Sequence, residues 1–294
     1  MIPKEILKKV RRIHIRTKHM VTDVFAGQYH SVFKGQGMEF QEVREYIPGD
    51  EIRWIDWNVT ARMGHPYVKK FTEERELTVM LLVDVSESNT FGSTPQLKKD
   101  LVAEVAAVLA FAAIQNNDRV GLILFSDTVE CFIPPRKGIA HVLRVIRETL
   151  YFKPRHKQTR LSAALDFLNR VATRKTVSFL ISDFLTSENL KRPITLTAKR
   201  HDLVSIFVDD RLEQAWPSAG VIDWIDAETG RRHLVDTSDA ATRRTFGLMQ
   251  TQRRENTEEL LRSSGVDIVR IHAGESYDRE LIRFFRQRER RLRT

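Results

Sequence analysis

Short apolar runs alternate with longer stretches of helical periodicity from residue 77 to the end of the chain. The first run, residues 77–85 (LTVMLLVDV), is apolar on both faces, which is typical of a strand buried between two layers of helices. The same patterns predict further strands at 119–126, 128–133, 176–182, 203–208 and 266–271, and helices at 96–115, 139–150, 161–173, 190–200, 251–264 and from Tyr277 onward. This alternation predicts a doubly wound, Rossmann-like α/β domain with a mainly parallel central sheet.

Two segments do not follow this alternation. Residues 21–76 are rich in glycine and aromatic residues, and residues 212–240 have the pattern of a strand, a turn and a second strand. We expect the two segments to pair with each other as a small β-rich subdomain. Residues 77–211 and 241–294 would then form the α/β domain.

The composition indicates a globular protein with a large core, because 41% of the 294 residues are hydrophobic. Cys131 is the only cysteine, which excludes an internal disulfide and a cysteine-based zinc cage. The chain contains neither an apolar stretch of the roughly 20 residues that a membrane helix needs nor a signal-peptide pattern, so we expect a cytoplasmic protein.

The formal net charge of +9 is concentrated at the two ends of the chain. Residues 1–20 hold seven basic residues against one acidic residue, and residues 279–294 hold seven against two. Ile2, Ile6 and Val10 fall at helical spacing in the first of these segments, which indicates a basic amphipathic helix that docks its apolar side. Binding of nucleic acid or a membrane surface through these basic ends is the alternative interpretation.

Five oxygen-bearing side chains lie where predicted elements meet loops. Asp84, Ser86 and Ser88 end or follow the first buried strand, Asp183 follows the strand at 176–182, and Thr159 precedes a helix. Ligands of parallel sheets bind where the carboxyl ends of the strands meet. Carboxylate and hydroxyl oxygens are hard ligands, so the pattern favours Mg²⁺, Mn²⁺ or Ca²⁺. Each residue alone could equally cap a turn or a helix.

The serines add a geometric requirement. An extended chain separates residues two apart by about 6.6 Å, whereas two ligands of one Mg²⁺ lie at most about 4.2 Å apart. Ser86 and Ser88 can therefore share a cation with Asp84 only if the chain curls back in a turn.

Three motifs, DVSES (84–88), TRLSAAL (159–165) and ISDF (181–184), resemble a von Willebrand factor A (VWA) domain with a complete metal-ion-dependent adhesion site. Residues 27–62 and 68–76 are similar to the bacterial family labelled domain of unknown function 58. The resemblance implies a six-stranded VWA fold and a metal site formed by Asp84, Ser86, Ser88, Thr159 and Asp183. It also implies an AAA+ ATPase partner of the MoxR group, with which such proteins are thought to remodel or mature other proteins.

These observations favour a non-enzymatic adaptor that binds an acidic side chain of a partner through the metal. Hydroxyl ligands add no charge, so a cation held by them can still accept an anionic oxygen from outside. A metal-dependent hydrolase is the alternative, although Glu87 is the only evident general base beside the site. The chain has no GxxxxGK[ST] motif, so we expect no ATP hydrolysis of its own.

Residues 44–62 combine both signs of charge with Trp54 and Trp57. The segment could be a docking surface for a partner. The interpretation that we favour is a structural role, in which Pro48 and Gly49 turn the chain, the tryptophans fill a core and arginine–aspartate pairs are half-buried.

Overall fold

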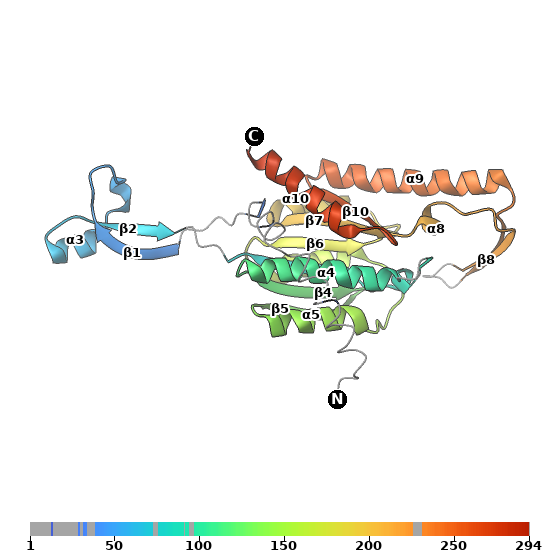
Figure 1. Cartoon of the computed structure of the whole chain (residues 1–294), viewed down its shortest axis with the longest axis horizontal. Helices are drawn as coiled ribbons and strands as arrows, with labels where there is room; N and C mark the ends of the chain where they lie inside the picture. Colours follow the sequence, from blue (N-terminus) through green and yellow to red (C-terminus); the bar gives the residue numbers. More distant parts are fainter. Residues whose placement is uncertain are drawn as a thin grey trace, which may run out of the picture. The chain divides into compact units, whose positions relative to one another are not determined.

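The computed structural model describes residues 13, 29, 32–33, 39–72, 76–90, 92–93, 97–225 and 231–293 (Figure 1). The chain divides into two compact units, one of residues 1–32 and 78–294 and the other of residues 33–77.

The larger unit is built on a six-stranded sheet with the strand order β10-β7-β6-β3-β4-β5. Neighbouring strands are parallel except β4 and β5, which are antiparallel. The strands are β3 (Thr78–Asp84), β4 (Arg119–Phe125), β5 (Val129–Arg136), β6 (Val177–Ser182), β7 (Asp202–Asp209) and β10 (Asp267–His272). The helices of this unit are η2 (Glu87–Thr90), α4 (Lys98–Gln115), α5 (Ile139–Tyr151), α6 (Leu161–Val171), α7 (Lys191–Arg200), α8 (Arg211–Gln214), α9 (Ala240–Ser263) and α10 (Tyr277–Arg293). The predicted doubly wound α/β fold is confirmed.

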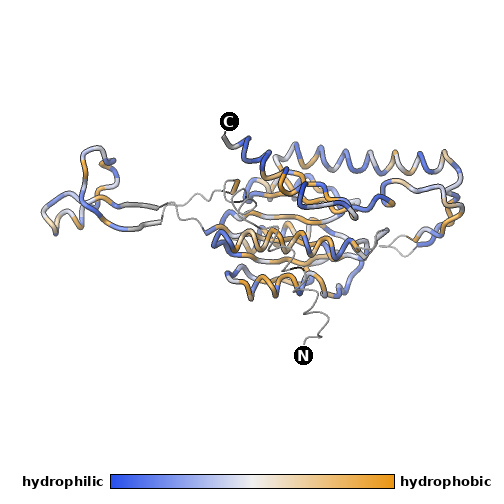
Figure 2. Tube along the Cα trace, viewed as in Figure 1, coloured by the Kyte–Doolittle hydropathy of each residue, from blue (hydrophilic) through white to orange (hydrophobic). Residues whose placement is uncertain are grey.

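Helices cover both faces of the sheet, so its central strands are buried on both sides. Met80 and Leu82 of β3 pack with residues of α6, α7 and the end of α9. Helix α4 lies against the opposite face, where α5 and α10 also run in front of the sheet in Figure 1. Fourteen of the eighteen residues of α4 are buried, and Figure 2 shows the hydrophobic character of this helix beside the more hydrophilic α9 and α10. This is why the strands are continuous apolar runs.

The strand that contains Pro134 and Pro135 lies at an edge of the sheet, because among the described strands β5 pairs with β4 alone. Proline cannot donate to a strand ladder, and the edge of a sheet tolerates that loss. Helix α9 begins eleven residues earlier than the predicted helix at 251–264, at the N-cap Asp239, whose carboxylate accepts from the backbone N–H groups of Ala241 and Thr242.

The prediction that residues 21–76 and 212–240 share one sheet is wrong for the strands that the structure describes. Strands β1 (Glu39–Glu45) and β2 (Tyr67–Thr72) pair with each other in the smaller unit. Strands β8 (Val221–Ile225) and β9 (Arg232–Asp236) form a separate antiparallel pair. In each segment, the two strands pair with each other. Pairing between strands that are close in sequence closes a shorter loop, which costs less conformational entropy than pairing between distant strands.

The smaller unit also contains η1 (Ile52–Trp54) and α3 (Trp57–Met63). The turn at Gly49 is present, with a φ of 115° that suits glycine, and Arg44 forms a two-point ion pair with Asp50 at 2.8 and 2.9 Å. The expectation that Trp57 fills a core is wrong, because this side chain is 67% exposed. It lies at the first position of α3, whose described residues include none that is buried.

Of the predicted N-terminal helix at 1–20, only Ile13 lies within the described residues, and it is buried. At the other end of the chain, basic residues of α10 are partly engaged within the protein. Arg288 bridges Asp202 and Asp267, and Arg291 also pairs with Asp267. None of the described helices combines the length and apolar character needed to cross a membrane.

Candidate metal centre

The first part of the candidate site is the end of β3 and the turn that follows it. Asp84 is the last residue of β3, and Asp84, Ser86 and Ser88 are all buried. The backbone N–H of Ser86 donates to Asp84 Oδ1 at 2.9 Å, and the hydroxyl oxygens of Ser86 and Ser88 lie 3.0 Å apart. The turn required for these three residues to converge is therefore present.

The neighbouring strand β6 supplies the second carboxylate. Parallel pairing of β3 with β6 sets Val83 opposite Ile181, so Asp183 follows β6 at the same edge as Asp84. The hydroxyl of Ser182 donates to Asp84 Oδ2 at 2.7 Å. Chain reversal after Asp183 places Phe184 at a φ of 57°, a conformation that is strained for a residue with a side chain. Buried stacking of Phe184 on Phe207, with centroids 4.1 Å apart, holds that turn in place.

Thr159 reaches the same edge on the loop before α6. The carbonyl of Lys157 accepts from the backbone N–H of Glu87 at 3.1 Å, and Arg160 N–H donates to Ser126 O at 2.8 Å. These bonds join the Thr159 loop to the turn after β3 and to the end of β4. The Thr159 side chain is buried, and its hydroxyl hydrogen-bonds to none of the residues that the structure describes. It does not cap α6, whose N-cap is Arg160.

The two carboxylates are electrostatically coupled. The pKa of Asp84 is raised to about 7, first by burial and then by the nearby charge of Asp183, while hydrogen bonds from Ser182 and Ser86 act in the opposite direction. A divalent cation would favour the ionised form of both groups. The donor set of two carboxylates and three hydroxyls suits Mg²⁺, Mn²⁺ or Ca²⁺. No group of three or more His, Cys, Asp or Glu side chains is placed to hold a metal ion in the described part of the chain, so the candidate site depends on hydroxyl oxygens beside its two carboxylates.

A buried lysine adjoins this site. Lys98 is fully buried, and its ammonium donates to Asp183 Oδ2 at 2.9 Å and to Glu213 Oε1 at 2.6 Å. Burial disfavours the charged amine, but the two carboxylates outweigh burial and raise the pKa of Lys98. Sequence reasoning did not single out Lys98. A weak signal existed, because a lysine in the first turn of a helix opposes the helix dipole and needs a compensating anion.

Glu213 connects this cluster to the short helix α8. The pKa of Glu213 is raised by its own burial, an effect that the nearby Lys98 opposes. Its second oxygen accepts from the backbone N–H of Asp210 at 3.1 Å, within a capping box. Asp210 in turn accepts from the backbone N–H of Ser93 at 2.8 Å. The segment after η2, helix α8 and the candidate metal centre are thus held together by one network of polar contacts.

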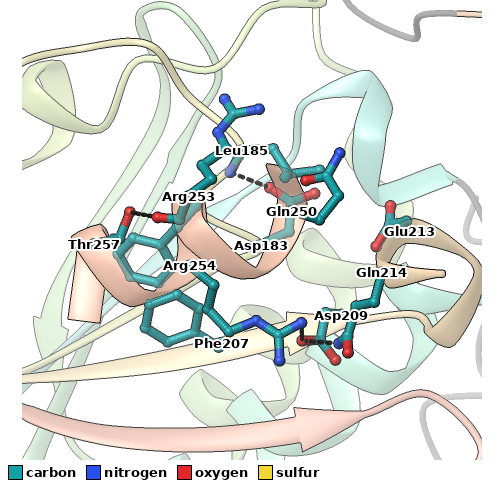
Figure 3. Close-up of a pocket in the computed structure, with 11 residues that line it drawn as sticks. Asp183, Leu185, Phe207, Asp209, Glu213, Gln214, Gln250, Arg253, Arg254 and Thr257 are labelled. Carbon is teal, nitrogen blue, oxygen red and sulfur yellow. Dashed lines mark hydrogen bonds and ion pairs between the residues drawn. The ribbon is translucent and has the colours of Figure 1, made fainter. Parts of the chain in front are cut away.

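Asp183 also lines a pocket at the same edge of the sheet, between α8, α9 and the ends of β6 and β7 (Figure 3). The polar and charged residues that line this pocket are Asp183, Asp209, Glu213, Gln214, Gln250, Arg253, Arg254 and Thr257.

The sequence matches the family described as "Protein of unknown function DUF58" over residues 42–257. The chain belongs to this family. Its relatives include an uncharacterized protein of Mycobacterium tuberculosis, Rv1480, which is 30% identical over 285 residues, or 96% of this chain and 89% of the relative. Another is the uncharacterized protein YeaD of Bacillus subtilis, 28% identical over 105 residues, or 36% of this chain and 24% of that protein.

Solved structures are similar to about three quarters of this chain. An aerotolerance-related membrane protein of Bacteroides fragilis has a TM-score of 0.50 and 14% identity, covering 73% of this chain and 99% of that one. The VWA domain of SpRpn10 has a TM-score of 0.39 and 12% identity, covering 72% and 95% of the two chains. At 14% identity, the likeness to the Bacteroides fragilis protein concerns the fold alone.

Proposed function

We propose that this protein is a non-enzymatic adaptor that binds a divalent cation through Asp84, Ser86, Ser88, Thr159 and Asp183 and uses it to hold an acidic group of a partner protein. The observation that carries the proposal is the convergence of two coupled, buried carboxylates with a buried Thr159 hydroxyl that has no partner in the described part of the chain. Buried polar groups are normally paired, so this arrangement suits a ligand held from several sides.

The charged and the neutral ligands would have different roles. Asp84 and Asp183 would supply the negative charge that holds the cation, and the three hydroxyls would supply neutral oxygens. The cation, when bound, provides an electrophilic point that an outside carboxylate can reach. Lys98 compensates part of the charge of Asp183 and Glu213 and keeps Asp183 fixed in position.

The family resemblance suggests the partner: a MoxR-type AAA+ ATPase, a client protein of that ATPase, or both. An AAA+ ATPase needs ATP, so we place the partnership in the cytoplasm. Catalysis is not part of the proposal. The carboxylate of Glu87, the candidate base beside the site in the sequence, lies 3.6 Å from the ammonium of Lys157 and is directed to that ion pair.

Metal binding is tested first. Mn²⁺ titration followed by electron paramagnetic resonance should show one site in the wild-type protein and at least a tenfold weaker affinity in Asp84→Asn, because the loss of one charged ligand costs more than about 1.4 kcal/mol. Asp127→Asn is the matched control: Asp127 lies just beyond β4 at the same edge and is half-buried. Equal Mn²⁺ affinity in all three proteins would contradict the proposal.

Partner binding is tested with the MoxR-type ATPase from the same genome. The wild-type protein and Asp127→Asn should capture it in Mg²⁺ and release it in EDTA, whereas Asp84→Asn should not capture it. Capture that survives both EDTA and Asp84→Asn would place the ATPase on another surface.

A further inference from the structure

The pocket beside the candidate metal centre has an uneven distribution of charge. At one end, Asp209 is engaged by three neighbours: Arg254 at 3.3 Å, Gln214 at 2.6 Å and His272. Figure 3 shows Arg254 and Gln214 directed to Asp209. The negative charge of Asp209 is therefore neutralised within the protein.

At the other end, Asp183 and Glu213 share the ammonium of Lys98. Together with Asp84, these two carboxylates exceed the charge of Lys98 by two. A bound divalent cation supplies the two missing positive charges. With the cation in place, the charges of Asp84, Asp183, Glu213 and Lys98 balance.

The positive charge of Arg253 is not compensated by any of these groups. It is exposed on α9, and Figure 3 places it on the Asp183 and Leu185 side of the pocket. Within the described part of the chain its guanidinium forms no ion pair, in contrast to the neighbouring Arg254, which pairs with Asp209. The backbone carbonyl of Arg253 accepts from the hydroxyl of Thr257. The guanidinium is therefore available to an anion from outside, for which a planar, bidentate donor is well suited.

We propose that the partner segment is acidic and binds at two points, with one carboxylate on the metal and a second on Arg253. This inference rests on the proposed function, since the first point of contact is the cation. Phe207 and Leu185 line the pocket between the polar groups, and apolar surface of this kind accommodates the methylene groups of aspartate and glutamate side chains. Gln250 adds a neutral amide on the same helix as Arg253.

The test compares two amidated, fluorescently labelled hexapeptides on the Mn²⁺-loaded full chain by fluorescence anisotropy. One contains six glutamates, and the other contains one glutamate and five glutamines, so only the first can reach both points. Wild-type protein should bind hexaglutamate more tightly than the single-glutamate peptide. Arg253→Gln should weaken hexaglutamate binding by roughly three- to tenfold, the range for an exposed to partly buried charged contact, and should leave binding of the single-glutamate peptide unchanged.

Arg244→Gln is the matched control. Arg244 is also exposed on α9. It lies nine residues before Arg253, which is about two and a half helical turns, so the two arginines are on opposite faces of the helix. Equal losses in both variants, or none in Arg253→Gln, would overturn the two-point contact. Hexaglutamate binding that persists in EDTA and in Asp84→Asn would instead overturn the proposed function, and with it the metal half of the contact. Separate Mn²⁺ titrations of Arg253→Gln should match wild type, because Arg253 is not one of the proposed ligands.

Discussion

At the scale of single residues, Lys98 departs furthest from the usual behaviour of its type. Lysine is almost never fully buried unless it is paired, and here two carboxylates pair with it in the interior. Removing one partner of such a group leaves uncompensated charge in a poorly solvated site. We therefore expect Lys98 to affect both the stability of the metal-free protein and the affinity of the proposed site for a cation.

Lys98→Met should destabilise the metal-free protein by about 3–5 kcal/mol, because Asp183 and Glu213 lose their counter-charge. It should also tighten Mn²⁺ binding, since a positive charge that repels the cation is gone. Urea unfolding in EDTA and Mn²⁺ titration measure the two effects. Lys99→Met, at the exposed neighbouring position, should change neither.

Glu213→Gln, in the same cluster, should change the Mn²⁺ affinity in the opposite direction. It removes a negative charge and should weaken Mn²⁺ binding, whereas Lys98→Met strengthens it. Structural damage would weaken binding in both variants, so a shift in the same direction would show that Lys98 acts through packing and not through charge.

At the scale of elements, an aromatic cluster attaches the β8–β9 hairpin to α9. Trp216 stacks on Phe246 with centroids 3.7 Å apart, and Trp224 lies against both rings at 5.2 and 5.9 Å. All three are partly buried, so the cluster lies at the surface of the unit. The outer face of the hairpin exposes Val221 and Leu234.

Phe246→Ala should loosen the hairpin and leave the central sheet intact. The expected cost is about 2 kcal/mol, less than the 3–5 kcal/mol of a fully buried phenylalanine because this ring is only partly covered. Hydrogen exchange should accelerate at residues 221–225 and 232–236 and stay slow in β3 and β6. Leu248→Ala is the control, because that side chain is 62% exposed; equal acceleration in it would argue against the aromatic attachment.

At the scale of the whole molecule, the pH dependence of stability depends in part on His201, which is buried where α7 ends and β7 begins. Its Nδ1 lies 3.3 Å from the backbone N–H of Thr176 and 3.1 Å from the Thr176 hydroxyl. Burial and, to a smaller extent, the nearby charge of Arg200 lower the pKa of His201 to about 4. The folded protein therefore holds this imidazole neutral where an unfolded chain would protonate it.

Because the folded pKa is the lower one, the stabilisation is fully present above about pH 6.5 and is lost as the pH falls towards 4. The loss should reach about 3 kcal/mol. Urea unfolding at pH 7 and pH 4.5 should show a smaller pH dependence in His201→Asn than in wild type, since asparagine can accept from Thr176 without titrating. His233→Asn, at an exposed position of β9, should keep the wild-type slope. Matching slopes in all three proteins would exclude His201 as the titrating group.

The sequence by itself determined the α/β architecture and the edge of the sheet at which Asp84 and Asp183 lie, because both depend on local patterns. Runs such as residues 77–85 are apolar on both faces only if helices cover both faces of their sheet. Once parallel strands are predicted, Asp84 and Asp183 must end at the same edge, and the pairing of Val83 with Ile181 confirms this. Whether a cation binds there stays a prediction.

Only the tertiary structure decided which distant groups meet. Lys98 contacts Asp183 and Glu213 across 85 and 115 residues, and nothing in the local pattern of α4 distinguishes it from the exposed Lys99. The two irregular segments each pair within themselves, and Trp57 lies exposed on α3, because burial and strand pairing depend on what the rest of the chain places nearby. Local periodicity fixes which residues of an element face inward, but not which side chains from other elements they face.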